Sequence, residues 1–181
     1  GAAAIENGTL LWDDAAGYPV VSKGGEWRQI VLEDGKYAGA VTADQTVGLI
    51  NTAYPLTYTS STADGIANGT PASRLVFDEA GQYMVSFSAQ IASTSSSTVN
   101  FWFWPRVNGT DVAGSTMKNA LHSNGSVLVV SRSAIFEFSA GDYLEAMWAV
   151  DSTSGFLDAT AATAFAPAAP ASTIAITRLH G

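Results

Sequence analysis

Two tryptophans, Trp102 and Trp104, have the type and spacing that best suggest binding chemistry in this chain. They lie in the segment 98–107, TVNFWFWPRV, where they alternate with two phenylalanines. Residues two apart in a strand share a face, so both faces of this segment carry aromatic rings. A solvent-exposed pair of indoles forms an apolar patch that requires a partner. We expect a subunit interface or a ligand platform, unless a loop or the N-terminal segment of the same chain covers the pair. The candidate residues are Trp102, Trp104, Arg106 and Trp148.

The sequence contains none of the motifs that assemble a catalytic centre. The sequence lacks the Gly-x-Ser-x-Gly and His-Glu-x-x-His motifs, and it also lacks a phosphate-binding loop and a dinucleotide-binding pattern. The chain has no cysteine and only two histidines, which excludes thiolate nucleophiles and multi-histidine metal sites. The acidic pairs Asp13-Asp14 and Glu33-Asp34 fall in predicted turns, where carboxylates are usually just solvated. We therefore predict a non-enzymatic protein with no cofactor.

Four aspartates could in principle supply oxygen ligands to calcium: Asp111, Asp142, Asp151 and Asp158. No Asp-x-Asp-x-Asp-Gly loop holds them together, and Asp142 is better explained as a turn residue. The sequence therefore predicts no metal site.

The charge of the chain restricts its partners. The formal net charge is −8, and only 8 residues are Lys or Arg, so no basic face for nucleic acid can form. No run of 18 apolar residues occurs, so no segment is expected to cross a membrane as a helix.

The composition favours strands over helices. Only 3 Lys, 6 Glu and 4 Gln occur in 181 residues, although these types normally fill the surfaces of helices. Ala, Gly, Ser and Thr dominate instead. We therefore expect an all-β chain whose strands carry Ser and Thr on their outer faces.

Period-2 alternation of apolar residues predicts five long strands. These are 82–92, 98–107, 126–138, 142–150 and 172–179, with shorter candidates at 48–51, 56–59, 74–77 and 155–159. Pro105 places the second strand near an edge or a bend. In the third strand, 126–138, the apolar residues change from one alternate set of positions to the other at 131–133, which predicts a bulge.

Turn signals separate the predicted strands, as in a sandwich or barrel. They are Asn-Gly pairs at 108–109 and 124–125 and tight turns at 78–81 and 139–142. The Ala-rich segment 159–171 is expected to be an extended loop.

The first forty residues form a separate region. A small three-strand β-meander is predicted there, with strands at 9–12, 18–21 and 26–32. It is too short to close a core by itself. Its aromatic residues Trp12, Tyr18 and Trp27 must therefore pack against something else, and we expect residues 1–32 to anchor the protein. A linker over 33–44 follows. The predicted division is 1–40 for the meander with its linker and 41–181 for the main domain.

Four ordered motifs from about Val47 onward resemble the jelly-roll domain of the tumour necrosis factor and complement globular-head family, most closely its phage versions. The motifs are AGQYMVSFSAQI, NFWFWPRVNGTDVAGST, FSAGDYLEAMW and PASTIAITRL, and the resemblance spans roughly 130 residues. The stretch WDDAAGYPVVSKGGEWRQI is similar to short modules of phage tail and head-appendage proteins.

The resemblance implies an antiparallel jelly-roll sandwich that assembles as a homotrimer about a threefold axis. It also implies binding or architecture without catalysis. We expect a bacteriophage virion protein on the outer surface of the particle, a capsid decoration or cement protein that contacts the major capsid protein or another virion protein. The alternatives are a receptor- or carbohydrate-binding knob of a tail or head fibre, with a host-surface glycan as partner, and a free carbohydrate-binding module. A long fibre shaft is missing from this chain, which favours the decoration protein.

Overall fold

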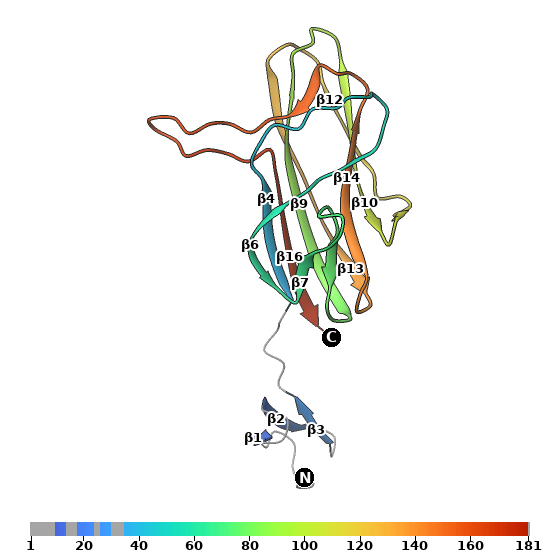
Figure 1. The fold of residues 1–181 in the computed structure, drawn as a ribbon, viewed down its shortest axis with the longest axis vertical. Coiled ribbons are helices and arrows are strands. Elements are labelled where there is room, and N and C mark those ends of the chain that lie inside the picture. The colour runs from blue at the N-terminus through green and yellow to red at the C-terminus, as the bar shows by residue number, and fades with distance from the viewer. Residues whose placement is uncertain (1–9, 14–17, 24–25, 30–34, 181) are drawn as a thin grey trace. The chain divides into compact units, whose positions relative to one another are not determined.

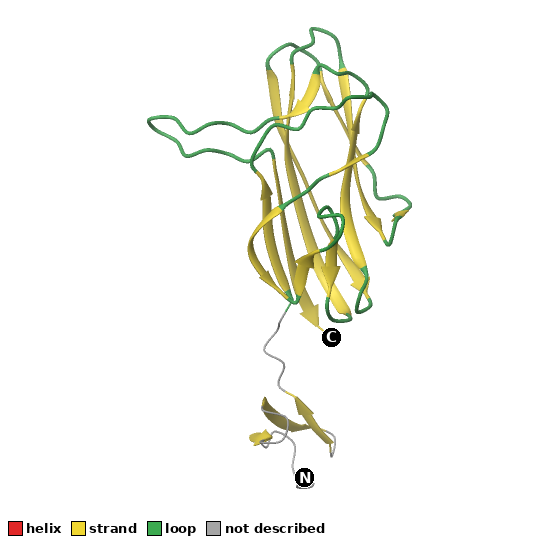
Figure 2. Cartoon of the chain, viewed as in Figure 1, coloured by secondary structure: helices red, strands yellow, loops and turns green. Residues whose placement is uncertain are grey.

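The chain forms two compact units, residues 1–34 and 35–181, and its described residues lie in strands and loops (Figures 1 and 2). The structure is a computed structural model that describes residues 10–13, 18–23, 26–29 and 35–180. No helix is found among these residues, as the composition predicts, and therefore none that could span a membrane.

The first unit contains a three-stranded antiparallel sheet in the order β1-β2-β3. Its strands are β1 (Leu10–Asp13), β2 (Tyr18–Lys23) and β3 (Glu26–Gln29). The predicted meander is therefore present, although residues 14–17, 24–25 and 30–34 lie outside the described part of the chain. Val20 is buried and Trp27 is half-buried within it.

The second unit is a sandwich of two antiparallel sheets. One sheet, here the β10 sheet, has the order β11-β10-β14-β8-β7, with β12 also paired to β10 and β5 to β14. Its strands are β5 (Tyr54–Pro55), β7 (Ile66–Asn68), β8 (Leu75–Phe77), β10 (Val99–Val107), β11 (Thr110–Asp111), β12 (Met117–Leu121) and β14 (Tyr143–Val150).

The other sheet, here the β9 sheet, has the order β13-β9-β16-β4-β6, with β15 also paired to β9. Its strands are β4 (Lys36–Val41), β6 (Thr59–Asp64), β9 (Gly81–Ser93), β13 (Ser126–Phe138), β15 (Gly155–Leu157) and β16 (Ser172–His180). From β8 onward the chain passes repeatedly between the two sheets, which is the connectivity of a jelly roll.

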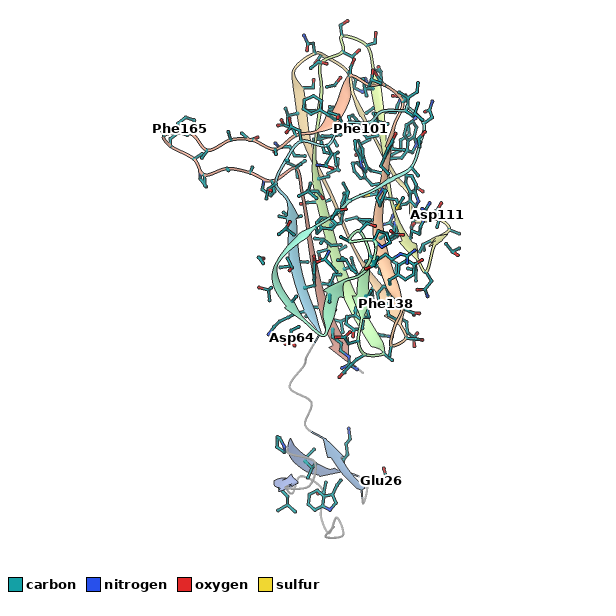
Figure 3. All side chains as sticks on the ribbon, viewed as in Figure 1. Glu26, Asp64, Phe101, Asp111, Phe138 and Phe165 are labelled. Carbon is teal, nitrogen blue, oxygen red and sulfur yellow. The ribbon has the colours of Figure 1, made fainter. Side chains whose placement is uncertain are left out.

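Aromatic and aliphatic side chains from both sheets fill the space between them. Phe77 and Phe138 stack with ring centroids 3.8 Å apart, and Tyr83 meets Phe77 edge-on at 4.8 Å. Phe101 is fully buried at the other end of the core; Figure 3 marks it and Phe138 inside the sandwich. These contacts join strands that are far apart in the sequence, so the core ties both sheets into one unit.

The predicted long strands are all present, but several shorter predictions are wrong. Segment 48–51 is a turn, and 56–59 contains only the first residue of β6. Segment 36–41, expected in a linker, is strand β4 in the middle of a sheet. The second compact unit therefore begins at residue 35. The segment 158–171 is a loop that projects from the sandwich as an arm, with Phe165 at its tip 91% exposed (Figure 3).

The predicted bulge in β13 is also wrong. β13 pairs with β9 without interruption from Ser126↔Ser93 to Phe138↔Gly81. The parity changes because Val127 and Val129 face out of the sandwich while Leu128 and Val130 face in, so this half of the strand is apolar on both faces. Pro105 fits its prediction, since it lies where the pairings of β10 with β11 and β12 leave a gap.

The turn between β13 and β14 depends on one carboxylate. Asp142 accepts hydrogen bonds from the backbone N–H of Ser139 at 2.7 Å and from the side-chain amide of Asn108 at 2.7 Å. Both bonds favour the charged form, the backbone bond most, and so lower the pKa of Asp142 below its ordinary 3.8.

We predict that Asp142 makes the protein sensitive to acid. A pKa that is lower in the folded state stabilises the fold above the unfolded value, and the contribution is lost as pH falls through the folded pKa. Asp142→Asn should therefore melt at a lower temperature than wild type at pH 7, and the gap should narrow below pH about 4. Melting curves between pH 7 and 3 measure it. A gap that is constant with pH would contradict the assignment.

Candidate functional site

Trp102 and Trp104 lie side by side on the outward face of the β10 sheet. Phe101 and Phe103, which alternate with them, are 0% and 2% exposed in the core, whereas both tryptophans are half-buried. The predicted two-faced aromatic strand is therefore confirmed. Trp102 has Lys118 of β12 opposite on one side and Ala149 of β14 on the other.

A tight hairpin brings an acid to the two tryptophans. Asn108 and Gly109 have φ of 49° and 78°, the left-handed conformation that a two-residue hairpin loop requires. The hairpin pairs Asp111 with Arg106, next to Trp104 on the same face. Figure 3 shows Asp111 on this hairpin, at the edge of the sandwich.

Asp111 is held as a carboxylate by two donors. Arg106 Nε donates to Asp111 Oδ1 at 2.7 Å, and Trp104 Nε1 donates to the same oxygen at 2.8 Å. These bonds, that of Arg106 most, lower the pKa of Asp111. No hydrogen bond from the described residues reaches the other oxygen, Oδ2. Asp111 is therefore a fixed acceptor beside the indole of Trp104.

A hollow of about 330 Å³ opens between the tryptophans and this acid. The small side chain of Ala149 leaves space beside Trp102. The Asn51 backbone N–H donates to the Val150 carbonyl at 2.8 Å, which places Asn51 at the end of β14. The residues lining the hollow are Asn51, Trp102, Trp104, Asp111, Val112, Thr116 and Ala149. Lys118 Nζ lies outside this lining, 5.4 Å from the Trp102 ring centroid, within the range of a cation–π contact.

Trp148 does not belong to this surface, so its prediction as an interface or platform residue is wrong. It pairs with Phe103 in the ladder, and directly paired residues share a face. Its side chain therefore points into the core, where it is 2% exposed with the Tyr54 ring 6.4 Å away. The sequence could not show this, because Met147 and Ala149 on the opposite face of β14 are buried too.

The four aspartates considered as calcium ligands each have a partner in the structure. Asp151 Oδ2 accepts from the Asn100 amide at 2.6 Å, and Asp158 Oδ2 accepts from Gln90 at 2.8 Å. Asp111 and Asp142 hold the hairpin and the turn described above. Among the described residues, no three His, Asp or Glu side chains come together as metal ligands would.

A second surface, which the sequence analysis did not identify, covers the outward face of the β9 sheet. Four large apolar side chains are exposed on it, between 39% and 61%: Met84, Val127, Val129 and Ile135. Ser, Thr, Ala and one glutamine, Gln90, occupy the positions between them on β9, β13 and β16. We call this surface the apolar face.

Two pairs of hydroxyl groups on the apolar face bond to each other across strands. Ser86 pairs with Ser133 at 2.9 Å, and Ser88 pairs with Thr173 at 2.7 Å. Because these hydroxyls already have partners, water can leave this surface without leaving them unpaired. The sequence signal for this face was the change of apolar alternation in β13, which the sequence analysis interpreted as a bulge.

Comparison with known proteins establishes the fold class. No known protein-family model matches the chain, and no curated protein matches it in sequence. Among solved structures, Eiger TNF from S. frugiperda is similar with a TM-score of 0.54 and 11% sequence identity, over 81% of this chain and 93% of that one. The second unit is thus a jelly-roll sandwich of the tumour necrosis factor type. At this identity the likeness concerns the fold.

Proposed function

We propose that this protein is a non-enzymatic structural protein of a bacteriophage virion, a homotrimeric decoration or cement protein on the outer surface of the particle. The jelly roll forms the trimer, and the N-terminal unit attaches it to the major capsid protein or another virion protein. The phage assignment rests on the sequence motifs that resemble phage jelly rolls and head appendages.

The apolar face carries the proposal of assembly. A monomer would expose two apolar pairs on one sheet surface, Met84 with Ile135 and Val127 with Val129, and four of the hydroxyls between them already bond to each other. Burying one such aliphatic side chain contributes about 1.5–3 kcal/mol. A head-to-tail contact between this face and a different surface of the next copy closes a ring, and three copies are expected by the resemblance to the tumour necrosis factor jelly roll.

The displaced pKa values support a structural role. Active sites usually concentrate such groups in one cleft. Here burial in the core raises the pKa of Tyr37, Tyr58 and Tyr83, and turn contacts lower the pKa of Asp111 and Asp142. Each shift has a packing or hairpin partner as its cause, so none calls for a catalytic explanation.

The N-terminal unit is the proposed anchor. Its candidate contacts are Trp12, Tyr18 and Trp27, on a three-stranded sheet too small for an independent core. Leu11 is 44% exposed on β1, which adds apolar surface for a partner.

Particles that lack this protein test the proposal. The full chain should bind them, and the chain 35–181, which contains the whole sandwich core, should fold and form trimers without binding. Co-sedimentation with the particles measures attachment, and light scattering measures assembly. Binding by the chain 35–181 would contradict the anchor, and failure of the full chain to bind any such particle would contradict the virion role.

A further inference from the structure

We propose that the hollow beside Trp102 and Trp104 binds a neutral pyranose of a glycan. The hollow lies on the β10 sheet, whereas the apolar face lies on the other sheet. This binding activity is therefore additional to the proposed assembly and does not depend on it.

The indoles supply the stacking surface. Trp102 and Trp104 are two residues apart on one strand face, so their Cα atoms are about 7 Å apart. A pyranose presents a face of C–H groups that packs on an aromatic ring, and such rings are rigid and contribute large apolar area. Both indoles are half-buried, so each is fixed by its neighbours and still reaches the surface.

Ala149 gives the hollow its depth. It pairs directly with Trp102 in the ladder, and it is buried at the base of the surface. A larger residue at this position would fill the space beside the indole. The volume of about 330 Å³ is sufficient for one sugar ring.

Polar groups around the hollow match sugar hydroxyls. Asp111 presents Oδ2 as an acceptor, and its side chain is fixed in advance by Arg106 and Trp104. Thr116 contributes a hydroxyl and Asn51 an amide, which together both donate and accept. Hydrogen bonds to a carboxylate are the stronger kind, and a fixed acceptor loses little entropy on binding.

The charge of the lining selects a neutral ligand. Asp111 is its only charged residue, since the described lining contains no Lys or Arg. The nearest cations are engaged, Arg106 by Asp111 and Lys118 by the Trp102 ring. A sugar carrying a carboxylate or sulfate would lie beside the Oδ2 atom of Asp111 with no cation of the lining free to pair with it.

Calorimetric titration of the full chain with lactose, maltotriose, mannotriose and chitotriose, after a screen on an array of neutral glycans, tests the inference. At least one neutral glycan should bind, and for lactose its sialylated form should bind at least tenfold more weakly. Trp102→Ala and Ala149→Leu should each weaken binding at least tenfold, and Asp111→Asn about fivefold.

Ala67→Leu is the matched control, because it makes the same enlargement at an exposed position of β7, on the same sheet and outside the hollow. It should bind like wild type. Ala149→Leu keeps both indoles, so it reports on the hollow even if Trp102→Ala folds poorly. The inference is overturned if no neutral glycan binds at concentrations up to about 10 mM. It is also overturned if Ala149→Leu binds the glycan with wild-type affinity, or if sialylated lactose binds more tightly than lactose. Trimer mass and particle attachment should not change in any of these variants, so failure here is distinct from failure of the virion role.

Discussion

Replacing Val129 and Ile135 together with glutamate is expected to convert the proposed trimer into folded monomers. Both side chains are exposed on the single sandwich, at 61% and 59%, so the substitutions leave its core intact. In a closed assembly the same positions become buried, and a buried carboxylate without a partner costs several kcal/mol. The loss is repeated at each of the three symmetric contacts. Light scattering should show that the mass falls from that of a trimer, about three times 18.8 kDa, to the 18.8 kDa of a single chain.

The control variant places one glutamate on a different surface. Thr110→Glu lies on the exposed hairpin strand β11 of the other sheet and should leave the mass unchanged. Circular dichroism should show the same strand content in all three proteins. If wild type is a monomer in dilute solution, or if the double variant keeps the full mass, the apolar face is not the assembly surface.

Most of the long strands could be predicted because apolar residues recur on one of their faces. In β9, Tyr83, Val85, Ala89 and Ile91 face the core at alternate positions. Strand β6, TSSTAD, has no such signal, since all six residues are exposed and only its pairing with β4 defines it. Strand β4 has small residues at Ala38, Gly39 and Ala40, which made it resemble a linker.

The candidate site could be predicted only where a single strand builds it. The alternation of Trp102 and Trp104 with buried phenylalanines is a local pattern, so the sequence shows it. Asn51, Thr116 and Ala149 come from three other segments that meet at the hollow only through the fold. The hydrogen bonds of Asp111 to Arg106 and Trp104 need the hairpin geometry as well as the Asn-Gly pair.

Two tryptophans that the sequence analysis grouped together should have very different effects on stability. Trp148 is 2% exposed between the sheets, and Trp102 is half-buried on the outer surface. Trp148→Ala should lower the free energy of unfolding by about 3–5 kcal/mol, since it removes buried contacts and leaves a cavity. Trp102→Ala should cost less, about 1 kcal/mol, because part of its ring is exposed at the surface.

The measurement is best made on the monomer that carries glutamate at 129 and 135, because unfolding is then independent of protein concentration. Urea unfolding followed by circular dichroism gives the midpoint and the slope for each variant. If Trp148→Ala is too unstable to purify, Trp148→Phe retains part of the packing and should fall between wild type and Trp148→Ala, because less volume is lost from the core. Equal losses at the two positions would show that Trp102 is covered within its own subunit. The hollow beside it would then be closed, and the glycan inference would fail by the same result.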